Sequence, residues 1–301
     1  MTRPALFQYH GVVLDYADLE YNPCDDIIFP TLVKTRGTMG DSVKSRWMMY
    51  YSPHDDPGGI CLALADNMRG PWREYPQNPL ITSQWHPHYS VSHVSSPHAV
   101  WNEEEEAIFL YFHGENDTTR FAVSRDGIHF TYGGTALNSD MCAGVYRVFY
   151  ARVFPYSTRG TPYNWLMLFM GTHDGSDQTS IFSAFSVDGR MWIPNDVPLI
   201  EKGCNTNFGA PCFFTVGNRN FLFYHEDSLK PDRTDAFDCT SNIKLYELNH
   251  DVTIRADLGV VLDHTCVSDD NDRVSDPVPV IDNGVIWLFI SIGTRLNQKL
   301  A

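Results

Sequence analysis

A short turn phrase recurs along this chain about every 60 residues, and it constrains the fold more than any other feature. Its clearest copies are Ser124-Arg-Asp-Gly-Ile-His-Phe130 and Ser186-Val-Asp-Gly-Arg-Met-Trp192, with a looser copy at Asp66-Asn-Met-Arg-Gly-Pro-Trp72. The runs between the copies are short, rich in β-branched and aromatic residues, and bounded by Gly, Asp, Asn and Pro, which is typical of strands and tight turns. A fixed period of this size, built of short strands, predicts an all-β fold, a five-bladed β-propeller in which each repeat forms one blade.

Five strand-pair units follow one another, and the last of them is short of outer strands. The units begin near Ile27, His93, Tyr150, Phe208 and Ser275. The N-terminal segment, residues 6–14, has a strand pattern but no unit of its own. Pairing it with the last unit would remove two open sheet edges. We therefore expect a single domain over residues 1–301, in which the N-terminal strand closes the last blade.

Histidines end the second strand of four units, at intervals of 59, 60 and 52 residues: His54, His113, His173 and His225. A propeller brings the same position of every blade to one central funnel. We expect these histidines to share one face with residues near the starts of the innermost strands, namely Asp26, His98, Arg152, Asn207 and Asp276. The alternative is that each histidine is structural and bonds the backbone of a neighbouring blade.

Charge and cysteine usage exclude some classes of partner. Lys plus Arg number 22 against 37 Asp plus Glu, which gives a net charge of −15. Such a surface repels nucleic acid and anionic membranes. No apolar run is long enough for a membrane helix or a signal peptide. The seven cysteines form no CxxC pair, which predicts free thiols and a cytoplasmic location.

The strand-opening phrases resemble those of the five-bladed propeller glycosidases, meaning the family 43 glycoside hydrolases and their relatives. The phrases are Asp26-Ile-Ile-Phe-Pro, Ser96-Pro-His-Ala-Val-Trp and Gly209-Ala-Pro-Cys-Phe-Phe. The resemblance implies an aspartate base opening the first blade, where Asp26 fits with Asp25 beside it. It also implies an aspartate in the second blade, which is His98 here, and a Glu-Gly-Pro phrase, which is altered here to Gly-Ala-Pro.

The resemblance implies a glycosidase. The extended loops before the first strands of units two and three favour a pocket over an open cleft, and we therefore expect a short oligosaccharide as substrate. Glycoside hydrolysis needs an acid and a carboxylate base or nucleophile, and carboxylates about 6.5–9.5 Å apart give inversion. We expect Asp26 as base, Glu226 as acid and His98 as a further catalytic residue. We expect substrate contacts from Asp25, His113, Arg152, His173, Asp276 and Tyr150.

Two other functions fit the same residues. A propeller polysaccharide lyase would use His or Tyr to abstract the proton beside a uronate carboxylate, and His98, His113, Tyr150 and Arg152 supply that set. A non-catalytic propeller that binds sugar or metal is the third interpretation. Products distinguish the first two, because hydrolysis adds water and elimination leaves an unsaturated sugar.

Converging histidines raise the question of a metal. Imidazole suits zinc and similar ions, and hard cations prefer oxygen ligands. The sequence has no local metal motif. We expect no required cofactor, with a divalent ion in the central channel, held by His225 and His173, as the alternative.

Overall fold

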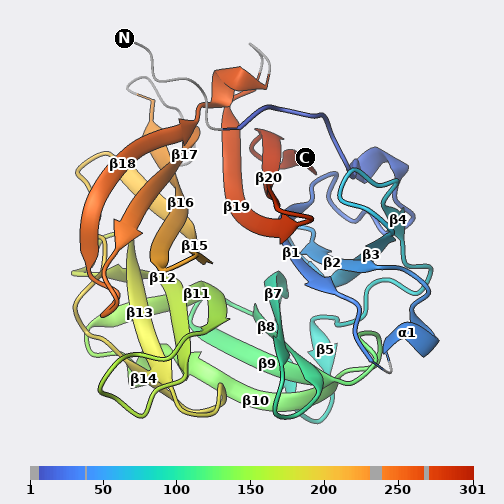
Figure 1. The fold of residues 1–301 in the computed structure, drawn as a ribbon, viewed down its shortest axis with the longest axis horizontal. Helices are drawn as coiled ribbons and strands as arrows, with labels where there is room; N and C mark the ends of the chain where they lie inside the picture. Colours follow the sequence, from blue (N-terminus) through green and yellow to red (C-terminus); the bar gives the residue numbers. More distant parts are fainter. Residues whose placement is uncertain (1–6, 38, 231–238, 268–270) are drawn as a thin grey trace.

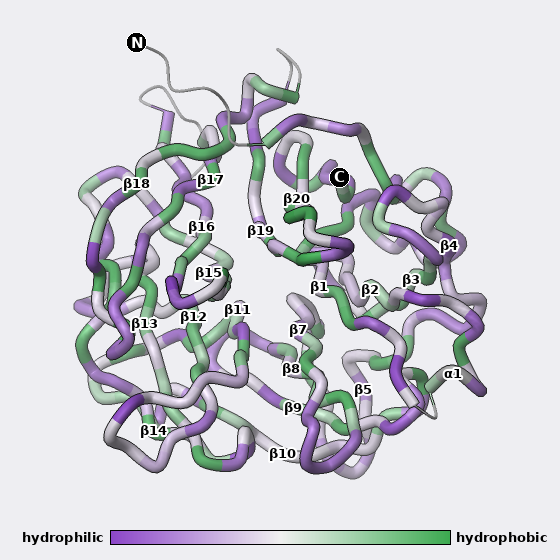
Figure 2. The backbone as a smooth tube through the Cα atoms, viewed as in Figure 1, coloured by the Kyte–Doolittle hydropathy of each residue, from purple (hydrophilic) through white to green (hydrophobic). Residues whose placement is uncertain are grey.

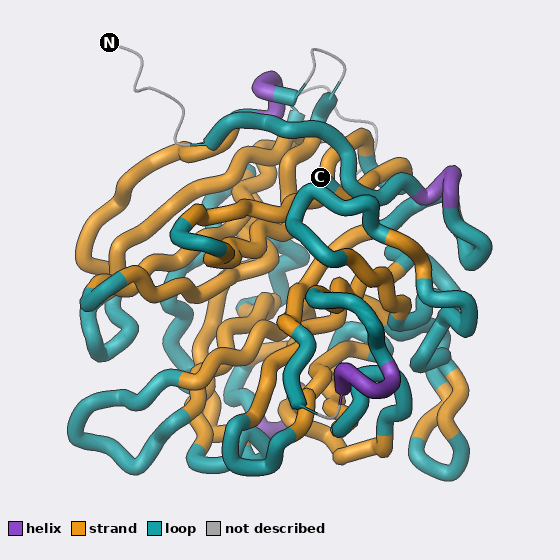
Figure 3. Tube along the Cα trace, turned by 45° about the vertical axis from the view of Figure 1, so that its right-hand side comes forward, coloured by secondary structure: helices purple, strands orange, loops and turns teal. Residues whose placement is uncertain are grey.

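The computed structural model describes residues 7–37, 39–230, 239–267 and 271–301, and in this part of the chain nearly all of the regular secondary structure is strand, connected by loops (Figure 3). Helix is confined to four short pieces: η1 (Tyr16–Asp18), α1 (Met39–Ser42), η2 (Ser139–Met141) and η3 (His264–Cys266). None of the helices described could cross a membrane, since none is long and apolar enough. The predicted all-β class is confirmed.

The strands form five consecutive antiparallel groups, which we call meanders 1 to 5. Meanders 1 to 3 are separate four-stranded sheets, and meanders 4 and 5 are joined into one seven-stranded sheet by the single parallel pair Ser241–Arg273. A small hairpin, β5 (Gln84–Trp85) and β6 (Tyr89–Ser90), lies between the first two. The strands are β1 (Ile28–Lys34), β2 (Trp47–Ser52), β3 (Cys61–Ala65) and β4 (Arg73–Glu74) in meander 1; β7 (Ser95–Asn102), β8 (Ala107–His113), β9 (Thr118–Ser124) and β10 (Thr131–Asn138) in meander 2; β11 (Val145–Pro155), β12 (Trp165–His173), β13 (Thr179–Ser186) and β14 (Trp192–Pro194) in meander 3; β15 (Thr206–Val216), β16 (Arg219–Leu229), β17 (Cys239–Leu248) and β18 (Ile254–Leu262) in meander 4; and β19 (Arg273–Asp282), β20 (Val285–Thr294) and β21 (Asn297–Leu300) in meander 5.

The first strands of the five meanders, β1, β7, β11, β15 and β19, surround the centre of the molecule (Figure 1). A buried apolar cluster lies between each meander and the next, and one such cluster also joins the last meander to the first. In that cluster Trp47 and Met49 of β2 lie with Val278 of β19 and Phe289 of β20. Figure 2 shows apolar residues along inner strands such as β1 and β8. Burial between neighbouring sheets, rather than within one sheet, therefore holds the molecule together.

The N-terminal segment forms backbone hydrogen bonds with the last meander only near Leu14, among the described residues. The Val13 N–H donates to the Leu300 carbonyl at 2.8 Å, and the Leu300 N–H donates to the Leu14 carbonyl at 3.0 Å. Leu6 lies outside the described residues, and residues 7–13 form no strand. The expected closing strand is thus reduced to the bridge at Leu14, and the single-domain assignment over 1–301 stays a prediction.

Each first strand carries a bulge at the same place. In every meander the register to the second strand shifts at this place, and one non-glycine residue there has a positive φ; the first strand of meander 3 has a further shift between Val145 and Arg147. Such a conformation is uncommon outside glycine, and a bulge bends its strand and re-aims side chains. The five residues are Phe29 (57°), Ser96 (55°), Tyr150 (52°), Ala210 (46°) and Asp276 (55°). These bulges define one equivalent position in all five meanders.

The recurring turn phrase joins neighbouring meanders. In its first clear copy the Gly127 N–H donates to the Ser124 hydroxyl at 2.8 Å, which closes the turn. The Gly127 carbonyl then accepts the hydroxyl of Tyr50 from meander 1 at 2.7 Å. In the next copy the Gly189 carbonyl accepts the hydroxyl of Tyr111 from meander 2 at 2.6 Å. In meanders 2 and 3 the phrase thus receives a buried tyrosine from the meander before it.

Candidate functional site

A central pocket of about 320 Å³ lies where the five first strands converge. Its wall is mixed, with histidines, aspartates and arginines from all five meanders and few apolar groups. Pockets of this size hold small ligands, and convergent polar groups orient them. The polar residues of the wall include His54, Asp55, Asp56, His93, His113, Arg147, Tyr150, Asn207, His225, Asp227, Arg273, Asp276, Arg295 and Gln298.

The four repeating histidines do not occupy equivalent positions. In each meander, the residue just before the bulge of the first strand pairs with one residue of the second strand. These second-strand partners are Ser52, His113, Met170, His225 and Ser291. Only His113 and His225 belong to this set. His54 lies two residues beyond it on a loop, and His173 lies three residues beyond it at the end of β12. The near-equal spacing of the four histidines in the sequence therefore does not place them at equivalent positions of the meanders, because loops of different length precede each bulge.

Six of the predicted residues line the pocket: His54, His113, Tyr150, Asn207, His225 and Asp276. Asp276 is 3% exposed, and its Oδ2 accepts the Ser291 hydroxyl at 2.7 Å. Tyr150 and Asp276 both sit at bulges, where the bent backbone turns them toward the centre. In meander 1 the same position is Phe29, so the expected base Asp26 is not equivalent to Asp276.

Asp26 lies one layer beneath the pocket wall. Its side chain is 1% exposed, and its Oδ1 accepts the Gln298 N–H at 2.5 Å. The Gln298 side chain donates to the Ser275 hydroxyl at 2.9 Å, and that hydroxyl donates to Asp276 at 3.3 Å. Asp26 is thus connected to the pocket through a hydrogen-bonded chain, but it does not line the pocket itself.

His98 and Arg152 are part of the core below the pocket. His98 donates from Nε2 to the Val153 carbonyl at 2.8 Å, and burial lowers the pKa of its imidazole to about 3. Arg152 is 0% exposed, stacks 3.9 Å from the Phe29 ring centroid and donates to the Pro30 carbonyl at 3.2 Å. This geometry corrects the expected catalytic and substrate roles of these two residues, because neither has a surface that a sugar could reach.

Three further predicted residues point away from the pocket. Side chains on strand β16 alternate between the two faces of the sheet, so His225 and Asp227 face the pocket. Glu226 faces the other side, where it pairs with Lys244 at 3.1 Å. His173 bonds Glu201 through Nε2 at 2.9 Å. Asp25 is exposed and bonds the Asn22 side chain at 2.7 Å. The expected acid Glu226 and the substrate residues Asp25 and His173 therefore lie outside the pocket.

The expected metal ligands also lie apart. His225 is in the pocket wall and His173 is not. Among the residues that the structure describes, no three His, Cys, Asp or Glu side chains are grouped so as to hold an ion. His173 and His225 therefore do not form one coordination site.

A buried network around Asp227 was missed from the sequence. Asp227 accepts two hydrogen bonds from Arg273 at 3.2 and 3.3 Å and one from the Ser241 hydroxyl. The His225 Nδ1 accepts the Asp276 N–H at 3.2 Å, so the neutral ring carries its proton on Nε2, 3.9 Å from Asp227. Burial alone would raise the pKa of Asp227, but Arg273, His225 and the Ser241 hydroxyl hold it below its usual value. Strand alternation from His225 was the signal that could have found it.

Meanders 1 and 3 bring together a three-residue relay. The Tyr150 hydroxyl lies 3.1 Å from His54 Nε2, and His54 Nδ1 lies 2.9 Å from Asp55 Oδ1. An acidic residue that orients an imidazole, which in turn contacts a hydroxyl, is the geometry that proteins use to move a proton to or from an oxygen. Burial raises the pKa of Tyr150 above its usual value, so its hydroxyl keeps a proton when no base takes it.

His113 stands next to this relay. Its ring centroid is 5.1 Å from that of Tyr150 and 5.4 Å from that of His93. Burial, together with His93, His54 and Arg120, holds the pKa of His113 well below its usual value. Its Nδ1 is buried without a hydrogen-bond partner among the described residues. A neutral imidazole is thus held in the wall of the pocket.

Asp26 carries a testable pH dependence. Burial raises its pKa to about 6, against the lowering effects of the Gln298 N–H, His54 and Arg273. Between pH 3.8, the ordinary pKa of an aspartate, and about pH 6, Asp26 keeps its proton in the native state but has lost it in the unfolded chain. The free energy of unfolding therefore falls as the pH rises through this window. Asp26→Asn should therefore raise the free energy of unfolding by about 1–3 kcal/mol near pH 8 and leave it unchanged near pH 4. Urea melts at the two pH values measure this.

The exposed Asp140 provides the control for this experiment. Asp140→Asn should shift stability by under about 0.5 kcal/mol at both pH values. If Asp26→Asn left the pH profile unchanged, the carboxylate would not titrate in this window and the burial argument would be wrong.

Comparisons with known proteins support the fold. No protein-family model matches the sequence, and no curated protein matches it. Among solved structures, a protein titled glycoside hydrolase is similar with a TM-score of 0.68 and 14% identity, over 91% of this chain and 86% of the other. An α-L-arabinofuranosidase from Podospora anserina in complex with cellotriose gives a TM-score of 0.61 and 10% identity, over 96% and 93%. A thermostable family-43 glycoside hydrolase gives 0.54 and 12%, over 72% and 74%. The chain thus has the fold of the β-propeller glycoside hydrolases, and the resemblance stated from its strand-opening phrases is confirmed at that level.

Proposed function

We propose that the five meanders close into a five-bladed propeller and that the central pocket cleaves a glycosidic bond of a short oligosaccharide by hydrolysis. The observation that carries the reaction is a carboxylate, Asp276, held in a pocket that also contains the Asp55–His54–Tyr150 relay. The ring is supported by the equivalent bulges and by the Phe29 N–H, which bonds Asp276 Oδ2 at 3.4 Å between the first and last meanders. Likeness of fold alone does not establish a reaction, so the residues of the site carry the proposal.

Asp276 is the residue best suited to act as base. Its Oδ2 is fixed by Ser291, and its Oδ1 lies 3.7 Å from His225 Nδ1. A fixed carboxylate can accept the proton of a water molecule as that water attacks the anomeric carbon. The proposal keeps an aspartate base and inversion of configuration, but it assigns the base to Asp276 instead of Asp26.

Tyr150 is the residue best suited to protonate the leaving oxygen. As the bond between the anomeric carbon and the glycosidic oxygen breaks, that oxygen takes the Tyr150 proton, and the phenolate regains a proton from solvent. His54 and Asp55 hold the hydroxyl in position throughout. The proposal requires no metal or cofactor, and we retain a carbohydrate partner and a cytoplasmic location as part of it.

A lyase is the second candidate, and the contact between the Tyr150 hydroxyl and His54 favours it. If His54 takes the proton of the Tyr150 hydroxyl, Tyr150 could remove the proton beside a uronate carboxylate. The glycosidic bond would then break by elimination. The pocket wall contains Arg147 and Arg273, which could face the uronate. Arg273 is shared with Asp227, which makes this arrangement weaker for an acidic sugar than for a neutral one.

Product analysis tests the two reactions. The protein is incubated with a panel of neutral and uronate-containing oligosaccharides, and the products are measured by mass spectrometry and ultraviolet absorbance. We expect the summed mass of the products to exceed that of the substrate by one water, without new absorbance. An unsaturated, absorbing product would replace the hydrolase with the lyase, and an unchanged panel would contradict both.

A further inference from the structure

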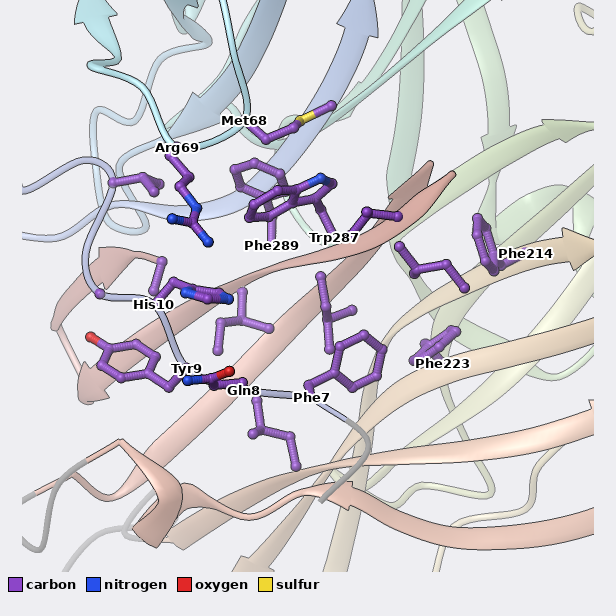
Figure 4. Close-up of a pocket in the computed structure, with 18 of the residues that line it drawn as sticks. Phe7, Gln8, Tyr9, His10, Met68, Arg69, Phe214, Phe223, Trp287 and Phe289 are labelled. Carbon is purple, nitrogen blue, oxygen red and sulfur yellow. The ribbon is translucent and has the colours of Figure 1, made fainter. Parts of the chain in front are cut away.

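A second, larger cavity of about 680 Å³ lies between meanders 4 and 5, and none of the residues that line it lines the central pocket. Its walls are apolar side chains of β15, β16, β17, β18 and β20, and residues 7–13 cross over it (Figure 4). Ligand pockets in proteins have volumes of roughly 300–1,000 Å³ and mostly apolar walls. Meander 5 has three strands where meander 4 has four, so an outer strand that would fill this space is absent from the described sheet.

The segment that covers the cavity, residues 7–13, is attached mainly by side chains. Phe7 packs edge-on against Phe223 at 6.2 Å, and His10 packs on Trp287 at 5.9 Å. Among the described residues, no backbone hydrogen bond joins residues 7–12 to the sheet, and the first such bond is made by Val13. A cover without backbone pairing can move aside at low cost and admit a ligand.

The two ends of the cavity differ in polarity. Figure 4 shows Arg69, His10 and Tyr9 on one side and Phe214 and Phe223 at the other. Arg69 is exposed, and its guanidinium stacks 5.5 Å from the Trp287 ring. No carboxylate pairs with Arg69 in the part of the chain that the structure describes, although the protein carries a net charge of −15. An unpaired cation at one mouth of an apolar cavity is complementary to a ligand with an anionic head and an apolar tail.

We propose that this cavity binds a small amphipathic carboxylate of the fatty-acid type, with its tail between meanders 4 and 5 and its head at Arg69. The tail would replace water against Phe223, Leu245 and Trp287, which supplies the hydrophobic driving force. The head would form a charge-assisted hydrogen bond with the guanidinium. The site is independent of the central pocket and of the reaction proposed there.

Calorimetric titration of the whole chain with dodecanoate, below its micelle concentration, tests the proposal. We expect saturable binding with one molecule per chain. Arg69→Gln should weaken dodecanoate binding about tenfold. The same change should leave the binding of dodecanol, which has the same tail without the charge, within about twofold of the wild type.

A matched pair of variants on one hairpin locates the ligand. Ile286 lines the cavity and is 40% exposed, while Ile281 is 48% exposed and does not line it. Because both side chains are already partly in water, neither substitution should prevent folding, and thermal melts check this. Ile286→Asp should abolish binding by placing a like charge against the ligand, and Ile281→Asp should not.

Several results would overturn the inference. These are an absence of saturable binding, equal effects of the two isoleucine variants, or equal losses for dodecanoate and dodecanol in Arg69→Gln. A second copy of the chain is the competing occupant of an apolar surface, so sedimentation is measured in parallel. A dimer that Ile286→Asp dissociates would replace the ligand with a partner chain.

Discussion

Asp276→Asn is expected to lower kcat by about 10²–10⁴-fold, because an amide cannot accept the proton of the attacking water. The change is isosteric, and asparagine tolerates the positive φ of 55° at this position. The amide oxygen can still accept the Ser291 hydroxyl, so the fold should persist. Steady-state kinetics on a substrate identified by the product panel, together with a thermal melt, measure both effects.

Two matched carboxylate variants make this prediction specific. Glu226→Gln removes a charge paired with Lys244 outside the pocket, and it should keep activity within about twofold of the wild type. Asp26→Asn should also remain active, since Asp26 does not line the pocket. Loss of activity in Asp26→Asn, with Asp276→Asn unaffected, would return the base to Asp26 and contradict the assignment made from the pocket.

A variant of the relay separates the two candidate reactions further. Tyr150→Phe removes the hydroxyl that His54 contacts and keeps the ring that packs on Phe29 at 5.2 Å. A hydrolase that uses Tyr150 only as acid should retain activity on substrates with good leaving groups, which need little protonation. A lyase should lose activity on every substrate, because its base is gone.

Arg273→Met is expected to lower the free energy of unfolding by about 3–5 kcal/mol. The side chains of Arg273 and Asp227 are only 13% and 11% exposed, and Arg273 Nη2 donates to both carboxylate oxygens of Asp227. Removing the cation leaves the Asp227 carboxylate buried beside His225 without a counter-charge. Urea unfolding at neutral pH measures the difference.

The ion pair of Arg255 with Glu247 is the control. The Arg255 side chain is 62% exposed and lies 3.1 Å from Glu247, whose carboxylate also pairs with Arg219 at 2.8 Å. Arg255→Met should cost at most about 1 kcal/mol, because the Arg255 cation is in solvent and Arg219 still pairs with the carboxylate. Equal losses in the two arginine variants would mean that the Asp227 network adds no more to stability than a surface pair does.

The sequence by itself determined the class of fold and the tight turns between its strands. Alternating apolar runs bounded by Gly and Asp can only be short strands with tight turns, and five such units appeared in both the sequence and the structure. The Ser124-x-Asp-Gly127 turn formed as its residue types predict, with Ser124 closing the turn and Gly127 at a φ of 77°. These features depend on neighbours within a few residues, and a local pattern records them directly.

Only the tertiary structure decided which side chains reach the pocket. A bulge in each first strand shifts the register, and a shift of one residue turns a side chain to the other face. For this reason Tyr150 and Asp276 face the centre, while Arg152, two residues after Tyr150, is buried below it. Asp227 faces inward and Glu226 outward for the related reason that side chains alternate along β16. The positive φ at non-glycine residues such as Asp276 could not be predicted from composition or spacing. It is imposed by the convergence of five strands from distant parts of the chain.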